Sequence, residues 1–242
     1  MIQSAINAIK AYFDALTIIR KLNLWKYFMI PVFISLITGI VIGSITYFLS
    51  DDLGSYIAQL WPWEFGKETF TTIGNFLGGI VILVIGLILY KHIVLALSSP
   101  FMSPVSLKIE EYLYGKQHQH KPSSFSESLA RGIRISVRNL GKELLITIPF
   151  LIIGLIPVIG IFTPIILFLV QAYYAGFGNM DFTLERHFKY KDTVTFVRKN
   201  RGTAIGNGII FILFQLIPFI GVVLVLPFSV TAATTETLKK IQ

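Results

Sequence analysis

Four long runs without a charged residue divide the chain. They cover residues 27–50, 69–90, 144–180 and 202–235. Each run exceeds the roughly 20 apolar residues that a helix needs to cross a bilayer. The first two runs therefore predict two long transmembrane helices. The last two carry helix-breaking residues near their middles and need a separate interpretation.

A six-residue sequence occurs once in each of the last two runs. It is LIPVIG at residues 155–160 and LIPFIG at residues 216–221, so the two copies differ at one position. Proline lacks the N–H that a helix needs and glycine tolerates a positive φ, so these residues bend or interrupt a helix. In a bilayer such a break persists only where it is buried in protein or lines a wet cavity. Each run is therefore either a proline-kinked span or a helical hairpin that turns at the repeat. The tip residues of such hairpins are Pro157, Gly160, Pro218 and Gly221.

The distribution of Lys and Arg favours hairpins, because basic residues concentrate in the cytoplasmic segments of membrane proteins. The formal net charges are +3 for residues 1–27, −3 for 50–68, +4 for 91–143, +3 for 181–201 and +1 for the C-terminal tail. Every segment except 50–68 is thus expected in the cytoplasm, both termini included, so each broken run enters the bilayer and returns. Arms of about 12 to 16 residues, or about 18 to 24 Å, would penetrate the ~30 Å hydrocarbon core without crossing it.

The first segment, residues 1–26, predicts an amphipathic helix rather than a signal peptide. Ile2, Ile6 and Phe13 belong to its apolar face, and the polar residues recur on the opposite face. Such a helix can lie in the membrane interface. Packing against the protein's own cytoplasmic face is an equally good interpretation.

The segment after the second span predicts two cytoplasmic helices. Ser103 is a suitable N-cap and Pro104 a suitable first residue, so we expect one helix to begin there and to end at Gly115. A second helix is expected from Phe125. The predicted organisation is one all-α membrane domain over residues 1–242, divided into the amphipathic helix 1–26, two transmembrane helices in 27–99, cytoplasmic helices in 100–143, the first half-penetrating (re-entrant) hairpin 144–180, the cytoplasmic link 181–201, and the second hairpin with the tail 202–242.

The chain offers little catalytic or metal-binding chemistry. It has no cysteine, and no nucleophile elbow, zinc-protease motif or phosphate-binding loop occurs in it. His118 and His120 lie in the polar stretch 116–124, where we favour a solvated loop over a metal site. We therefore expect no enzyme activity, cofactor, metal or nucleic-acid partner.

Basic residues precede both hairpins. Arg131 and Arg138 lie close in helical angle before the first, and Arg198 and Arg201 precede the second. They suit contact with anionic lipid headgroups, or attraction of an anion to a pore mouth, and both interpretations stay open. The uncharged runs hold no carboxylate that could relay a proton, so facilitated passage of an anion fits them better than proton-coupled transport.

The order of several short motifs resembles the CysZ-like sulfate permeases of the etoposide-induced-protein superfamily. The motifs are the amphipathic start, the two spans, Ser99-Pro100-Phe101, Asp181-Phe182-Thr183-Leu184, the bases Arg198 to Arg201 before Gly206, and the two repeat tips. The resemblance covers nearly the whole chain. It implies a homo-oligomeric protein of the bacterial inner membrane, with two transmembrane helices and two half-penetrating hairpins, that passes sulfate inward for cysteine synthesis.

The same resemblance directs attention to the start of the first span. CysZ-like proteins have a Gly-Leu-Arg motif there that is associated with sulfate binding, whereas this chain has Asn23-Leu24-Trp25 followed by Lys26. Lysine binds an oxyanion as a point charge rather than through a planar fork. The implied anion-binding candidates are Arg20, Asn23, Leu24 and Lys26, with Arg131, Arg138 and Arg201 as electrostatic attractors. The leading hypothesis is passive, channel-like uptake of sulfate or a related oxyanion, and the alternative is a structural or lipid-interacting membrane protein without transport.

Overall fold

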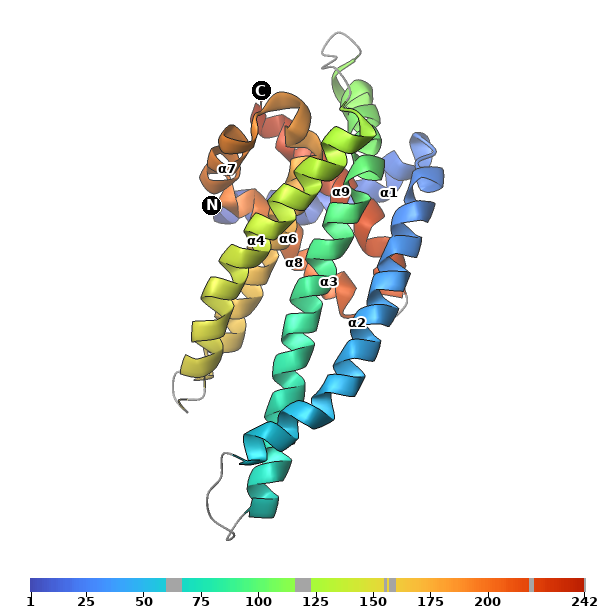
Figure 1. Cartoon of the computed structure of the whole chain (residues 1–242). Helices are drawn as coiled ribbons and strands as arrows, with labels where there is room; N and C mark the ends of the chain where they lie inside the picture. The colour runs from blue at the N-terminus through green and yellow to red at the C-terminus, as the bar shows by residue number, and fades with distance from the viewer. Residues whose placement is uncertain (60–66, 116–122, 155, 157–159, 218–219, 242) are drawn as a thin grey trace. The chain divides into compact units, whose positions relative to one another are not determined.

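The computed structural model describes residues 1–59, 67–115, 123–154, 156, 160–217 and 220–241. Within these residues the chain forms eight helices and no strand. The helices are α1 (Ile2–Lys21), α2 (Trp25–Gln59), α3 (Lys67–Tyr114), α4 (Phe125–Ile153), α6 (Thr163–His187), α7 (Tyr190–Lys199), α8 (Arg201–Gln215) and α9 (Ile220–Ile241). The predicted all-α class is confirmed for this part of the chain (Figure 1).

The chain divides into two compact units. One contains residues 1–35 and 92–242, and the other contains residues 36–91. In the second unit α2 and α3 pack antiparallel, because Gly86 lies against Ile42 and Thr46 while Gly39 lies against Tyr90. α2 and α3 also contain the two stretches long and apolar enough to cross a membrane, Trp25–Leu49 and Gly78–Tyr114. The two predicted transmembrane helices are thus present as helices of the required length and composition.

The predicted helix start at Ser103 and Pro104 is wrong. α3 continues through Pro100 and Pro104 and ends at Tyr114, after 48 residues. The two prolines remove the N–H groups that would bond the carbonyls of residues 96 and 100, yet the helix continues. It is held there by packing on α6, where Arg186 donates to the backbone oxygen of Ser103 at 3.1 Å.

The two predicted helix boundaries after this point are confirmed. Gly115 follows the last residue of α3 with a φ of 79°, and its N–H donates to the carbonyl of Glu111. α4 begins at Phe125, where Ser124 and Glu127 form a capping box. Both signals are local, which explains why the sequence alone could locate them.

Each of the two proline-containing runs folds as two antiparallel helices rather than as one kinked helix. In the first, Arg131 of α4 contacts Asp181 of α6 near the open end, and Gly154 lies against Thr163 near the turn. Figure 1 shows α4 and α6 side by side. In the second, Phe214 of α8 stacks on Phe228 of α9 across the turn. The described residues thus form two helices in each run, and re-entrant hairpins that return to the cytoplasmic side stay a prediction.

The core of the first unit lies where α6 and α8 meet. A Cβ at Gly208 of α8 would lie 1.7 Å from the carbonyl oxygen of Ala172, and a Cβ at Gly176 of α6 would lie 1.8 Å from that of Ala204. Only glycine permits so close a backbone approach. The buried side chains around this contact come from α4, α6, α7, α8 and α9: Ile135, Phe177, Met180, Leu184, Val197, Ala204 and Ala233.

α1 packs on α8 and α9 through a face of small residues that includes Ala8, Ala11 and Ala15. Tyr12 on this face donates a 2.8 Å hydrogen bond to the backbone oxygen of Asn207. This contact supports the interpretation in which the helix packs against its own protein. Phe13 on the predicted apolar face is nevertheless 81% exposed, so contact of that face with the membrane interface stays a prediction.

Candidate functional site

The junction between α1 and α2 brings together several of the predicted anion-binding residues. Asn23 makes the turn with a φ of 50°, a conformation that asparagine tolerates better than most residues. Leu24 is fully buried and anchors the turn, while its carbonyl accepts from the N–H of Tyr27. α2 begins at Trp25, so the N–H groups of its first turn, that of Lys26 among them, lack a carbonyl four residues earlier within the helix.

Two lysines lie near the ring of Tyr27 in the first turn of α2, and we call these three residues the junction cluster. The Nζ atom of Lys26 lies 5.4 Å from the centre of the Tyr27 ring, and the Nζ atom of Lys108 on α3 lies 4.8 Å from the same centre. Lys26 is exposed and Lys108 is half-buried. The cluster therefore combines two positive charges with the positive end of a helix dipole, an arrangement that favours an anion.

Lys108 could not be predicted as a site residue from the sequence, because it is far from Lys26 along the chain. Nothing in the pattern of α3 distinguishes this lysine from other surface bases, and only the packing of α3 near the junction reveals it. Arg20, by contrast, was predicted and lies exposed in the last turn of α1. Its neighbour Lys21 lies 4.8 Å from the centre of the Tyr112 ring of α3, so basic side chains continue around the junction.

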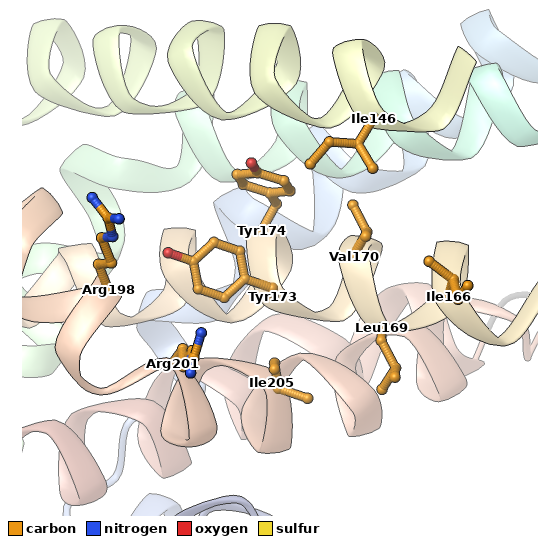
Figure 2. A pocket seen from close by; sticks show the side chains of 9 residues that line it. All are labelled: Ile146, Ile166, Leu169, Val170, Tyr173, Tyr174, Arg198, Arg201 and Ile205. Atoms are coloured by element: carbon orange, nitrogen blue, oxygen red, sulfur yellow. The ribbon is translucent and has the colours of Figure 1, made fainter. Parts of the chain in front are cut away.

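A second basic region surrounds a pocket of about 390 Å³ in the first unit. α4, α6, α7 and α8 build the pocket, and Figure 2 shows its lining side chains. We call it the tyrosine–arginine pocket. Its lining residues are Ile146, Ile166, Leu169, Val170, Tyr173, Tyr174, Arg198, Arg201 and Ile205.

Three arginines lie at or near the polar end of the tyrosine–arginine pocket. Arg198 and Arg201 line it, and Arg138 approaches it through Phe177, whose ring packs against the ring of Tyr173. Arg138 belongs to α4 and lies 5.1 Å from the centre of the Phe177 ring, where it also donates to the side chain of Asn139 at 2.7 Å. The structure thus brings two of the predicted electrostatic residues, Arg138 and Arg201, to one place and adds Arg198 to them.

Arg131 belongs to a different environment. Its guanidinium pairs with Asp181 at 2.8 Å and donates to the backbone oxygen of Phe188 and to the hydroxyl of Thr193. The Arg131 side chain is only 16% exposed. Burial raises the pKa of Asp181, while the adjacent guanidinium opposes this shift. The geometry gives Arg131 a structural task in joining α4, α6 and α7, and it does not support the predicted role in attracting anions.

The predicted hairpin tips are partly described. Pro157 and Pro218 lie outside the described residues, as do His118 and His120. Gly160 donates to the carbonyl of Ile156, and a Cβ at Gly160 would lie 2.3 Å from the oxygen of Gly154. The first turn therefore requires glycine at this position. Gly221 lies in the first turn of α9.

Comparison with known protein families shows to which family the chain belongs. The family described as "Sulfate transporter CysZ/Etoposide-induced protein 2.4" matches residues 11–225. The chain belongs to this family. The family and the two long apolar helices together identify a membrane protein related to sulfate transport. No curated protein matches the chain.

Proposed function

We propose that this protein mediates passive, channel-like passage of sulfate or a related oxyanion into the cell for sulfur assimilation. The observation that carries the proposal is the junction cluster. In this cluster Lys26 and Lys108 both lie near the ring of Tyr27, at the first turn of an apolar helix long enough to cross the membrane. The chain belongs to a family whose description names a sulfate transporter, and this supports the choice of sulfate as the anion.

The chemistry of the junction cluster suits a small dianion. Two ammonium groups approach one ring, so their charges would act together on an anion held beside it. Hydrogen bonds from charged donors are stronger than those from neutral donors. We infer that Lys108 compensates for the arginine that the Gly-Leu-Arg motif would have supplied, since two point charges replace one planar fork.

The proposed path uses the two hairpins as segments that enter the bilayer from the cytoplasmic side. In the described part of residues 181–201, the exposed charges are five bases against one acid, because Asp181, Glu185 and Arg186 pack inside the first unit. This excess of exposed bases supports a cytoplasmic position for α7. α8 has 15 residues and is about 22 Å long, which is too short to cross the hydrocarbon core. We propose a homo-oligomer in the bacterial inner membrane, with both termini in the cytoplasm.

Radiolabelled sulfate uptake into proteoliposomes tests the proposal. Lys26→Ala and Lys108→Ala should each reduce uptake at low sulfate concentration by about tenfold, since a hydrogen bond to a charged group contributes roughly 1.5 kcal/mol or more. Lys240→Ala is the matched control, because Lys240 is an exposed lysine at the end of α9. Absence of flux for sulfate and for other oxyanions through the folded protein would favour the alternative, a structural or lipid-interacting member of the family.

A further inference from the structure

The tyrosine–arginine pocket has two ends of opposite character. Figure 2 shows Arg198, Arg201 and the hydroxyl of Tyr173 gathered at one end, with Ile166 and Leu169 toward the other. Both arginines of the polar end come from the positively charged segment 181–201, which follows the first hairpin. The apolar end lies within the uncharged run of residues 144–180. The pocket therefore spans the boundary between charged and apolar sequence.

Arg198 and Arg201 at the polar end are exposed, and they differ in this from the buried or half-buried arginines of the first unit. Arg131 pairs with Asp181, and Arg186 pairs with Glu110 at 3.0 Å. Among the described residues, no carboxylate lies within ion-pair distance of Arg198 or Arg201.

Glu143 of α4 is the acidic residue nearest in sequence to Ile146, which lines the pocket. Its carboxylate already lies 2.9 Å from the Nε2 atom of His92. The positive charges of Arg198 and Arg201 are thus left for a ligand with a negative charge.

The apolar end determines what kind of anion fits. A small hydrated anion such as sulfate would contact the arginines and leave Ile146, Val170 and Leu169 exposed to water. An anion attached to a hydrocarbon chain would satisfy both ends, because burial of the chain against these side chains is favourable. Tyrosine has an apolar ring and a polar hydroxyl, and it suits the boundary between headgroups and acyl chains.

We propose that the tyrosine–arginine pocket binds one anionic membrane lipid, with its phosphate against Arg198 and Arg201 and an acyl chain along Ile166 and Leu169. Arg138 adds a third positive charge nearby, since it lies 5.1 Å from the centre of the Phe177 ring, which packs against the ring of Tyr173. The lipid would connect α4 and α6 of the first hairpin with α7 and with α8 of the second hairpin. This site is separate from the junction cluster and does not depend on sulfate transport.

Native mass spectrometry of the full chain with added phosphatidylglycerol tests the proposal. The double variant Arg198→Ala/Arg201→Ala should weaken retention of this lipid by roughly 30-fold, because each base near an anionic surface contributes a factor of about 5. Lys189→Ala/Lys191→Ala is the matched control, since it removes two exposed charges beside or in α7 that do not line the pocket. We expect less than a twofold change in the control. An equal loss in both double variants would overturn the proposal.

Two further arms separate a lipid site from a site for small anions. Phosphatidylcholine should not be retained, and added sulfate or inorganic phosphate should not displace phosphatidylglycerol. Displacement by either ion, or equally tight binding of glycerol phosphate without acyl chains, would contradict the proposal. Leu169→Asn changes the exposed apolar end alone and should reduce retention of long-chain lipid while leaving the arginines in place. If the double arginine variant does not fold, unchanged retention in Leu169→Asn would overturn the proposal by itself.

Sulfate uptake measured on the same variants keeps this inference distinct from the proposed function. Loss of lipid retention with normal flux would support the lipid site and show that transport does not require it. Normal lipid retention in Arg198→Ala/Arg201→Ala would reject the lipid site. The proposed transport function would still be tested separately, by sulfate uptake in Lys26→Ala.

Discussion

Gly208 is the position where one added methyl group should most clearly disturb the first unit. In Gly208→Ala the new Cβ would lie 1.7 Å from the carbonyl oxygen of Ala172. The oxygen belongs to the backbone of α6 and cannot move aside as the end of a flexible side chain could. α6 and α8 must therefore separate, and the buried side chains around their contact lose packing.

The expected cost follows from two opposing effects. Overpacking of a close-packed interior costs about 1 to 3 kcal/mol. Alanine is a better helix former than glycine, which returns up to about 1 kcal/mol. We expect a net loss of about 1 to 2 kcal/mol, which corresponds to a fall in melting temperature of roughly 2 to 8 °C for a chain of this size.

The assay is the thermal stability of the purified protein in detergent, measured as the fraction that stays monodisperse after heating. Gly141→Ala is the matched control, because Gly141 is an exposed helical glycine whose added Cβ would meet no atom within 4 Å. The control should melt at the wild-type temperature or slightly above it. The reasoning would be refuted by a folded Gly208→Ala protein that melts as high as the Gly141→Ala protein.

Two other predictions concern a buried ion pair and the topology. Arg131→Ala should destabilise the protein by about 3 to 5 kcal/mol, because it leaves the buried carboxylate of Asp181 without a counter-charge. Arg131→Ala/Asp181→Asn should recover part of this loss in the same melting assay, and a double variant no more stable than the single one would contradict the assignment. Cysteines introduced singly at Lys67 and Lys189, in a chain that has no cysteine of its own, should react with an impermeant thiol reagent from opposite sides of the membrane. Labelling from the same side would overturn the returning hairpins.

The elements that could be predicted from the sequence are those specified by residues within or next to the element. The two apolar helices follow from the length of uncharged sequence, and the ends at Gly115 and Phe125 follow from capping residues. The break in each proline-containing run also follows from local chemistry. Gly160 illustrates this, because the close approach of Gly154 leaves no room for a side chain.

The features that the sequence did not predict depend on contacts between distant segments. The local sequence around Pro104 favours a helix start, yet Pro104 lies inside α3. The contacts of α3 with α6 are what the local sequence does not reveal. Arg131 and Arg138 share one basic stripe in sequence, yet a carboxylate of α6 neutralises only the first. Lys108 becomes a candidate because α3 packs near the junction, which no pattern within α3 indicates.

The most direct test of the proposed function is the initial rate of sulfate uptake into proteoliposomes that contain wild-type protein, Lys26→Ala, Lys108→Ala or the Lys240→Ala control. The proposal predicts uptake above that of empty vesicles for the wild type and the control, with about tenfold lower uptake at low sulfate concentration for either junction variant. Wild-type uptake equal to that of empty vesicles, or full uptake in both junction variants, would contradict it.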